Sequence, residues 1–173
     1  MKAVLMSIQP KWCELIASGK KTVEVRKNKP KLETPFKVYI YETQGRTETP
    51  FVDEEGHHIF KGRGQVIGEF VCDRIDYWQY NWLPDVMHIE DMSELSCVSV
   101  DDLLKYSNNA KDTLYGWHIT DLVIYDEQRE LGEFRSYNVR AYFDEKSGLP
   151  MPTHEITRPP QSWCYCEEVN DGN

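Results

Sequence analysis

Long apolar runs are missing from this sequence, and so are the familiar motifs of catalysis. No stretch reaches the roughly 18 apolar residues of a membrane-spanning helix, so we expect no membrane partner. The opening residues MKAVLMSIQP lack both a long apolar segment and a small-residue cleavage site, which favours the first strand of a cytoplasmic protein over a signal peptide. The chain contains no P-loop, no HExxH and no G-x-S-x-G motif, and the sequence supports no Cys/His nucleophile, so no strong catalytic motif is visible.

Cysteine is scarce, and its spacing forms no framework. An odd count of five predicts reduced thiols in a reducing compartment. Cys164 and Cys166 form a C-x-C pair that suits half of a metal site, but no second pair or histidine cluster stands beside it, and two small buried side chains are the simpler interpretation. His57 and His58 fall in a charged, glycine-rich segment typical of a loop. We therefore expect no metal and no cofactor.

Positive charge is in short supply, and it is unevenly distributed. The chain has 20 Lys and Arg against 29 Asp and Glu, for a net charge of −9, which argues against general nucleic-acid binding. Residues 1–31 nevertheless carry eight Lys or Arg and only two acidic residues, Glu14 and Glu24. This asymmetry fits a local anion-binding patch on a repelling body, although solvated loop lysines would give the same count.

Size and composition favour one domain of mixed structure. The chain has 173 residues, 40% of them hydrophobic, and we expect a single domain over residues 1–169 with a frayed tail at 170–173. The alternation of apolar and polar residues predicts five or six short strands and few helices. This pattern indicates an α+β fold around a small curved sheet or barrel. Strands are predicted at 3–8, 22–26, 36–43, 65–77 (with a bulge near 73–74), within 114–126 (most clearly at 122–125) and at 162–169. Helices are predicted at 10–18 and after Ser99, irregular structure at 78–99, a connector at 127–134, and a strand or insertion at 137–143.

The stretch from Ser7 to Arg26 has the clearest local pattern. Pro10 suits the first turn of a helix, and Gly19 suits a left-handed stop at its end. The strand that follows should carry Thr22, Glu24 and Arg26 on one face, with Lys21 beside them. Two interpretations stay open: a solvated edge strand with a weak Glu24–Arg26 pair, or the wall of a binding cleft.

Several motifs of the chain resemble an ASCH domain of the PUA-like group. The opening S-I-x-P-x-aromatic, the turn G-K-K-T and the strand T-V-E-V-R carry the likeness, in which G-x-K-x-x-E-x-R corresponds to Gly19, Lys21, Glu24 and Arg26. YGWHITDLVIYDE and RPPQSWCYCEE are similar to segments of small bacterial and phage ASCH proteins. The resemblance implies a PUA-like small β-barrel of five to six strands, with the first helix at its rim and an irregular, partly helical insertion. The last strand would return beside the first.

The resemblance and the residue types together suggest a nucleic-acid- or nucleotide-binding module, for single-stranded RNA or a modified base. Aromatic rings would stack on bases, and lysine and arginine would neutralise phosphate. The phosphate contacts would be Lys21 and Arg26, whereas an ordinary aromatic core would explain the tryptophans equally well. The fold would place Trp163 and Tyr165 near these two cations. The predicted cleft residues are Gln9, Lys21, Thr22, Glu24, Arg26, Trp117, His118, Trp163 and Tyr165.

Two further functions remain as alternatives. Some ASCH-like proteins are N4-acetylcytidine amidohydrolases, whose catalytic lysine corresponds to Lys21 and whose catalytic threonine is replaced here by Glu24, while Thr22 matches a non-catalytic position. Lys21 and Glu24 would then form a general acid/base pair, and Glu69 is a candidate for the distant glutamate of that family. A metal-assisted ribonuclease is a related possibility. The third class is an interaction domain of phage or host origin that binds a protein partner; the oligomeric state stays open.

Overall fold

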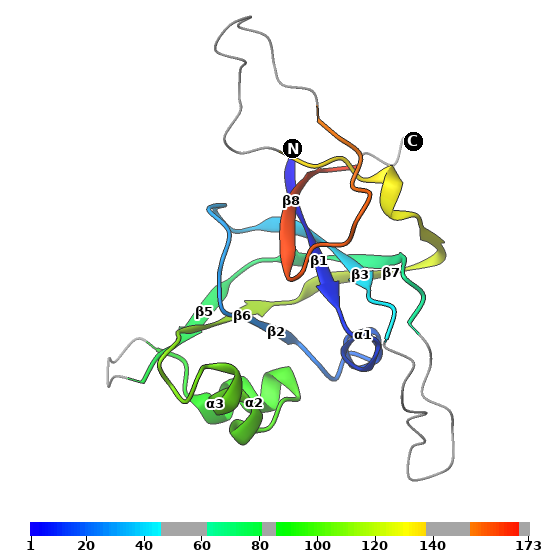
Figure 1. The fold of residues 1–173 in the computed structure, drawn as a ribbon. Coiled ribbons are helices and arrows are strands. Elements are labelled where there is room, and N and C mark those ends of the chain that lie inside the picture. Colours follow the sequence, from blue (N-terminus) through cyan, green and yellow to red (C-terminus); the bar gives the residue numbers. More distant parts are fainter. Residues whose placement is uncertain (46–61, 81–85, 138–152, 170–173) are drawn as a thin grey trace, which may run out of the picture. The chain divides into compact units, whose positions relative to one another are not determined.

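The computed structural model describes residues 1–45, 62–80, 86–137 and 153–169, and these residues contain three α-helices, one short 3-10 helix and eight strands (Figure 1). The chain packs as two compact units. The first unit comprises Met1–Cys13, Lys37–Glu69 and Ile124–Asn173, and the second comprises Glu14–Phe36 and Phe70–Val123.

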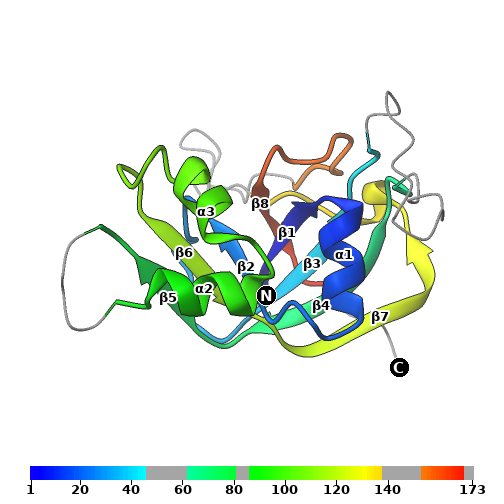
Figure 2. The ribbon, with the colours of Figure 1, turned by 90° about the horizontal axis from the view of Figure 1, so that it is seen from below.

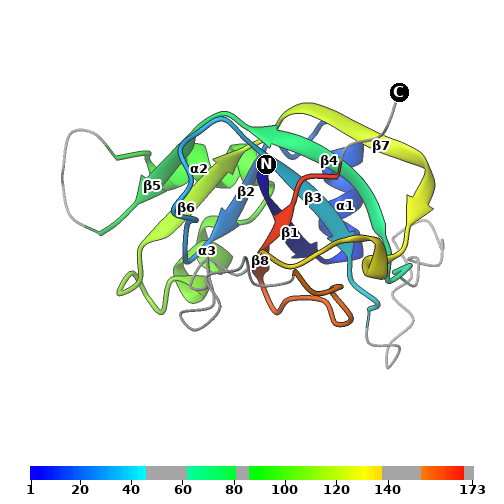
Figure 3. The ribbon, with the colours of Figure 1, turned by 90° about the horizontal axis from the view of Figure 1, so that it is seen from above.

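A five-stranded sheet organises the first unit. Its order is β7-β4-β3-β1-β8, formed by β7 (Thr120–Arg129), β4 (Val66–Cys72), β3 (Phe36–Glu42), β1 (Lys2–Ile8) and β8 (Trp163–Glu167) (Figure 3). The last strand pairs antiparallel with the first, as predicted, and β1 pairs parallel with β3. Because β1 has a neighbour on both sides, its apolar run is buried over nearly its whole length. The core of this unit gathers Leu5, Tyr39, Phe134, Ile156 and Cys166.

The second unit is built on a three-stranded antiparallel sheet in the order β2-β6-β5, from β2 (Val23–Arg26), β6 (Leu114–His118) and β5 (Ile75–Trp78). Two helices, α2 (Ile89–Ser96) and α3 (Val100–Tyr106), lie beside these strands (Figure 2). Met92 and Leu103 from the helices form one buried cluster with Val23, Val25 and other side chains of the sheet. One face of the sheet therefore holds the core of the unit.

Local signals in the sequence account for the helix ends. Helix α1 (Pro10–Ala17) begins at the proline, and Gly19 follows it with a φ of +73°. The Lys21 N–H donates to the carbonyl of Leu15 at 2.9 Å, which closes the helix end directly before β2. At the start of α3, the Ser99 side chain accepts a hydrogen bond from the Asp102 N–H at 3.2 Å. These positions agree with the sequence prediction.

Other predictions were wrong in instructive ways. Residues 65–77 form two strands, because the chain breaks at Asp73–Arg74 and β4 and β5 enter different sheets. The stretch 78–99, predicted to be irregular from its residues, contains α2, which agrees with the partly helical insertion that the resemblance implied; the mostly polar sequence IEDMSELS gives little helical periodicity to recognise. Residues 114–126, where one strand was expected, form β6 and the first part of β7, and β7 continues to Arg129 through part of the expected connector. Residues 138–143, the tail 170–173 and the His57–His58 pair lie outside the described residues.

The α+β class is confirmed, but the barrel is not. In the described part of the chain the strands form two separate sheets and no closed barrel is found. Eight strands are present there, where five or six were expected. No helix among the described residues is long and apolar enough to cross a membrane.

Candidate functional site

The centre of the candidate site is a buried network of three charged side chains around β2. Glu24 on β2 contacts Lys21 at 3.2 Å (Nζ to Oε2) and Arg26 at 2.9 Å (Nη2 to Oε1). The three residues are only 2%, 6% and 8% exposed in chain order. The interpretation as a solvated edge strand is therefore wrong, since two cations and one carboxylate are withdrawn from water together.

The G-K-K-T turn is anchored to the end of α2. Lys21 Nζ donates to the carbonyl oxygen of Ser96 at 2.8 Å, and the Thr22 N–H donates to the carbonyl of Leu95 at 2.9 Å. A cation at this end of a helix is favourable because the last carbonyls carry partial negative charge. Thr22 itself is exposed and lies one residue before β2 begins, whereas Lys21 is locked between the helix end and Glu24.

Strand register shows which residues share a face with this network. Glu24 is paired with Trp117, and Arg26 with Tyr115, which in turn is paired with Tyr77 on β5. Directly paired residues of antiparallel strands point to the same side of a sheet. We call Glu24, Arg26, Tyr77, Tyr115 and Trp117 the polar face. The apolar core occupies the opposite face, through residues such as Val23 and Val25.

Sequence reasoning missed the two tyrosines of this face. Both are half-buried, and Lys29 Nζ lies 5.7 Å from the centre of the Tyr115 ring. The alternation of Tyr115 with the predicted residue Trp117 was visible in the sequence, but the pairing of β5 with β6, which adds Tyr77, was not. Trp117 is fully buried and packs edge-to-face against Phe36, with ring centres 5.7 Å apart. Tyr115, rather than Trp117, therefore offers the more accessible ring.

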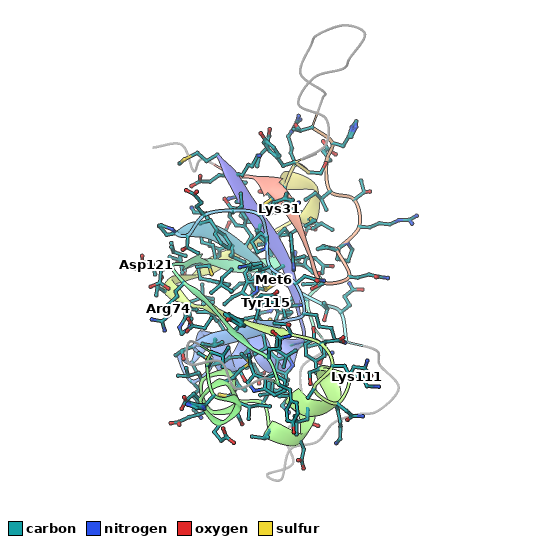
Figure 4. The ribbon with its side chains drawn as sticks, turned by 90° about the vertical axis from the view of Figure 1, so that its left-hand side faces the viewer. Met6, Lys31, Arg74, Lys111, Tyr115 and Asp121 are labelled. Carbon is teal, nitrogen blue, oxygen red and sulfur yellow. The ribbon has the colours of Figure 1, made fainter. Side chains whose placement is uncertain are left out.

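His118 belongs to a different cluster. It is paired with Val23, so it points away from the polar face. Its Nε2 lies 2.7 Å from Asp76 Oδ2, and Arg74 donates to the same carboxylate oxygen at 3.1 Å. Arg74 Nη2 also lies 3.1 Å from His118 Nε2. Figure 4 shows Arg74 and Asp121 toward one edge of the second unit, away from Lys111.

The remaining predicted residues belong to the first unit. Gln9 is exposed at the start of α1, where its carbonyl accepts hydrogen bonds from the N–H groups of Trp12 and Cys13. Trp163 and Tyr165 are half-buried on β8, with ring centres 5.4 Å apart and the rings nearly perpendicular. Their meeting with Lys21 and Arg26 in one cleft remains a prediction, because the two groups belong to different units.

Glu69 and the five cysteines are the other candidate groups. Glu69, the candidate distant glutamate, accepts a hydrogen bond from the Tyr125 hydroxyl at 2.6 Å and pairs with Lys37 at 2.7 Å, all within the first unit. All five cysteines are free thiols, and burial raises the pKa of Cys164 to about 11. In the described ranges, no group of three or more His, Cys, Asp or Glu side chains is placed to hold a metal ion.

The family profile and the similar solved structures indicate the same family. The ASCH domain profile matches residues 6–146. A mutant of an ASCH protein from Zymomonas mobilis has a similar crystal structure, with a TM-score of 0.57, 17% identity, and coverage of 96% of this chain and 89% of that chain. A second structure of ASCH from Zymomonas mobilis gives a TM-score of 0.53 at 16% identity, with 96% and 88% of the two chains covered. No curated protein gives a significant sequence match. Since the profile spans well over half of the sequence, the chain belongs to the ASCH domain family.

Proposed function

We propose that this protein is a nucleic-acid- or nucleotide-binding module that takes single-stranded RNA or a modified base, and that residues 1–169 act as one domain. The observation that carries the proposal is the buried network in which Lys21 and Arg26 share the single carboxylate of Glu24. Two cations against one anion leave a net positive charge in a chain whose net charge is −9. An anionic group of a ligand would balance the remaining positive charge of this network.

The polar face supplies the chemistry for a base as well as for phosphate. Arg26 has a planar fork that suits a phosphate or a base edge, and Glu24 is an acceptor for an amino group of a base. Tyr115 and Tyr77 are paired beside Arg26 and provide aromatic surface for stacking. The sequence prediction also assigns Gln9, Thr22, Trp163 and Tyr165 to the ligand, whereas His118 points away from the polar face and is not part of this proposal.

Fluorescence anisotropy with a labelled single-stranded RNA tests the proposal. Arg26→Lys keeps the charge but removes the planar fork, so we expect affinity to fall about tenfold, which corresponds to about 1.4 kcal/mol. Arg129→Lys is the matched control, because Arg129 also pairs with a glutamate, at 3.0 Å from Glu133, and lies in the first unit. Circular dichroism checks that both variants are folded. Absence of RNA binding by the wild-type protein at low salt would refute the proposal, as would equal affinities of the wild-type and the Arg26 variant.

A hydrolase acting on acetylated cytidine is the second candidate, and the contact between Lys21 and Glu24 at 3.2 Å is the observation that favours it. Glu24 would take a proton from water, and the water oxygen would attack the acyl carbon. Glu24 would then pass that proton to the departing cytidine nitrogen as the C–N bond breaks, which gives cytidine and acetic acid, and the acid ionises to acetate. Incubation with N4-acetylcytidine, followed by mass spectrometry, tests this activity, with Lys21→Ala as the control. The same assay on a short RNA reports strand cleavage. Intact substrates without RNA binding would leave the protein-interaction alternative.

A further inference from the structure

We propose that the backbone of a bound single-stranded RNA runs over an exposed basic surface of the second unit, and this inference rests on the proposed function. The basic surface consists of residues 27–31, which follow β2, and residues 105–115, which run from α3 into β6. Lys21 and Arg26 are buried and engaged with Glu24, so they do not provide the exposed charges along which a phosphate chain can run. Lysines that reach solvent are needed for that contact.

Specific contacts join the two segments into one surface. Lys27 Nζ lies 3.0 Å from Asp112 Oδ2 and 5.1 Å from the centre of the Tyr106 ring. Lys29 Nζ lies 5.7 Å from the centre of the Tyr115 ring. The loop after β2 is therefore held against α3 and β6 by cation–π contacts and an ion pair, and lysines alternate with tyrosines across it.

Charge distinguishes this surface from the rest of the chain. Its two segments carry five lysines and one acidic residue, whereas the whole chain has a net charge of −9. All five lysines are exposed, and Tyr106 is 41% exposed, so both charge and aromatic surface are accessible. In the view of Figure 4, Tyr115 lies between Lys31 and Lys111. Alternating cations and aromatic rings are the arrangement by which proteins bind single-stranded nucleic acids without strong sequence preference.

An unusual turn lies within the same surface. Asn108, Asn109 and Ala110 have consecutive positive φ values of 55°, 53° and 66°, a conformation that is disfavoured for residues other than glycine. The Ser107 side chain holds the turn, since its Oγ accepts a hydrogen bond from the Ala110 N–H at 3.0 Å. Both asparagines are exposed directly before Lys111, so their amide groups can hydrogen-bond to bases stacked next to the tyrosines.

The test uses the full chain and a labelled 12-nucleotide single-stranded RNA of mixed sequence, with affinity measured at several salt concentrations. We expect the double variant Lys29→Ala/Lys31→Ala to bind at least tenfold more weakly. The slope of log affinity against log salt should fall in magnitude by about 1.4, because each phosphate contact on a single strand contributes about 0.7. Tyr106→Ala should bind about tenfold more weakly with the slope unchanged, because a lost stacking contact releases no counterions.

Two controls separate the effect of this surface on RNA binding from the effect of the net charge of the protein. Lys29→Arg/Lys31→Arg should keep the wild-type affinity and slope. Lys11→Ala removes a lysine that also lies over a ring, 4.6 Å from Trp12 in the first unit, and should leave RNA binding unchanged.

If the wild-type protein binds RNA and the Lys29/Lys31 alanine variant binds equally well, the basic surface is refuted and the proposed function stands. If Lys11→Ala weakens binding as much, net charge explains the effect and the surface is again refuted. If the wild-type protein does not bind RNA, both proposals fail.

Discussion

Replacement of Glu24 by glutamine is the sharpest test of how the charged network contributes to stability. The substitution keeps the size of the side chain, so it creates no cavity, but it removes the negative charge that Lys21 and Arg26 share. The two cations then face one another with their side chains 2% and 10% exposed. Glutamine has one acceptor oxygen where glutamate has two, so one of the two cations would face the NH2 group of the amide and lose its contact with a carboxylate oxygen.

The burial of the three side chains sets the size of the effect. Breaking a buried ion pair typically lowers the free energy of unfolding by about 3–5 kcal/mol, whereas an exposed pair contributes about 1 kcal/mol or less. With a urea m-value of about 2–3 kcal/mol/M, the expected loss moves the midpoint of unfolding down by about 1–2.5 M.

Urea unfolding followed by circular dichroism measures this shift, with Asp112→Asn as the matched control. Asp112 pairs with Lys27 at 3.0 Å in the same unit, but its side chain is 41% exposed, so we expect its loss to cost less than about 1 kcal/mol. The double variant Lys21→Met/Glu24→Gln should have a free energy of unfolding at least 0.5 kcal/mol higher than that of Glu24→Gln alone, which is roughly the lower end of the couplings between residues in contact. A loss below about 1 kcal/mol for Glu24→Gln would show that water reaches the network and would refute the reasoning from burial.

Three smaller predictions follow from local structure. Ser99→Ala should lower the free energy of unfolding by about 1 kcal/mol, measured by urea unfolding, because the N-cap of α3 loses its hydrogen bond to the Asp102 N–H. Gly19→Ala should cost a similar amount in the same assay, since φ is +73° at this position and alanine disfavours that conformation. Cys164 should react slowly with iodoacetamide at pH 8 in the native state, because burial raises its thiol pKa from 9.0 to about 11. Since the folded state holds this proton more tightly than the unfolded state, the free energy of unfolding should fall as the pH rises from 9 toward 11.

The buried carboxylate also bears on the choice between binding and hydrolysis. Glu24 occupies the position where the amidohydrolase resemblance implies a catalytic threonine, and it is held from both sides by cations. A general base must exchange a proton with water or substrate during each cycle. The RNA-binding assay and the N4-acetylcytidine assay separate these two roles.

Much of the local structure could be predicted from residue types alone. Pro10 and Gly19 mark the helix between them, Ser99 marks the start of α3, and the run FKVYIYE is a strand in the structure, as expected. Such signals act within a few residues, through backbone conformation and single hydrogen bonds, so they need no knowledge of the rest of the chain. The family motif is equally local, because Gly19, Lys21, Glu24 and Arg26 lie within one turn and one strand.

Only the tertiary structure decided which of these residues are covered. The alternation in β2 shows that Glu24 and Arg26 share a face, but a sequence period does not say whether that face meets solvent or protein, and here it is buried. The break at Asp73–Arg74 likewise depends on two sheets that accept the strands on either side of it. Tyr77 and Tyr115 join the candidate site because β5 pairs with β6 across about forty residues of sequence. The sequence therefore determined the local elements and the charged motif, whereas long-range strand pairing determined their burial and their neighbours.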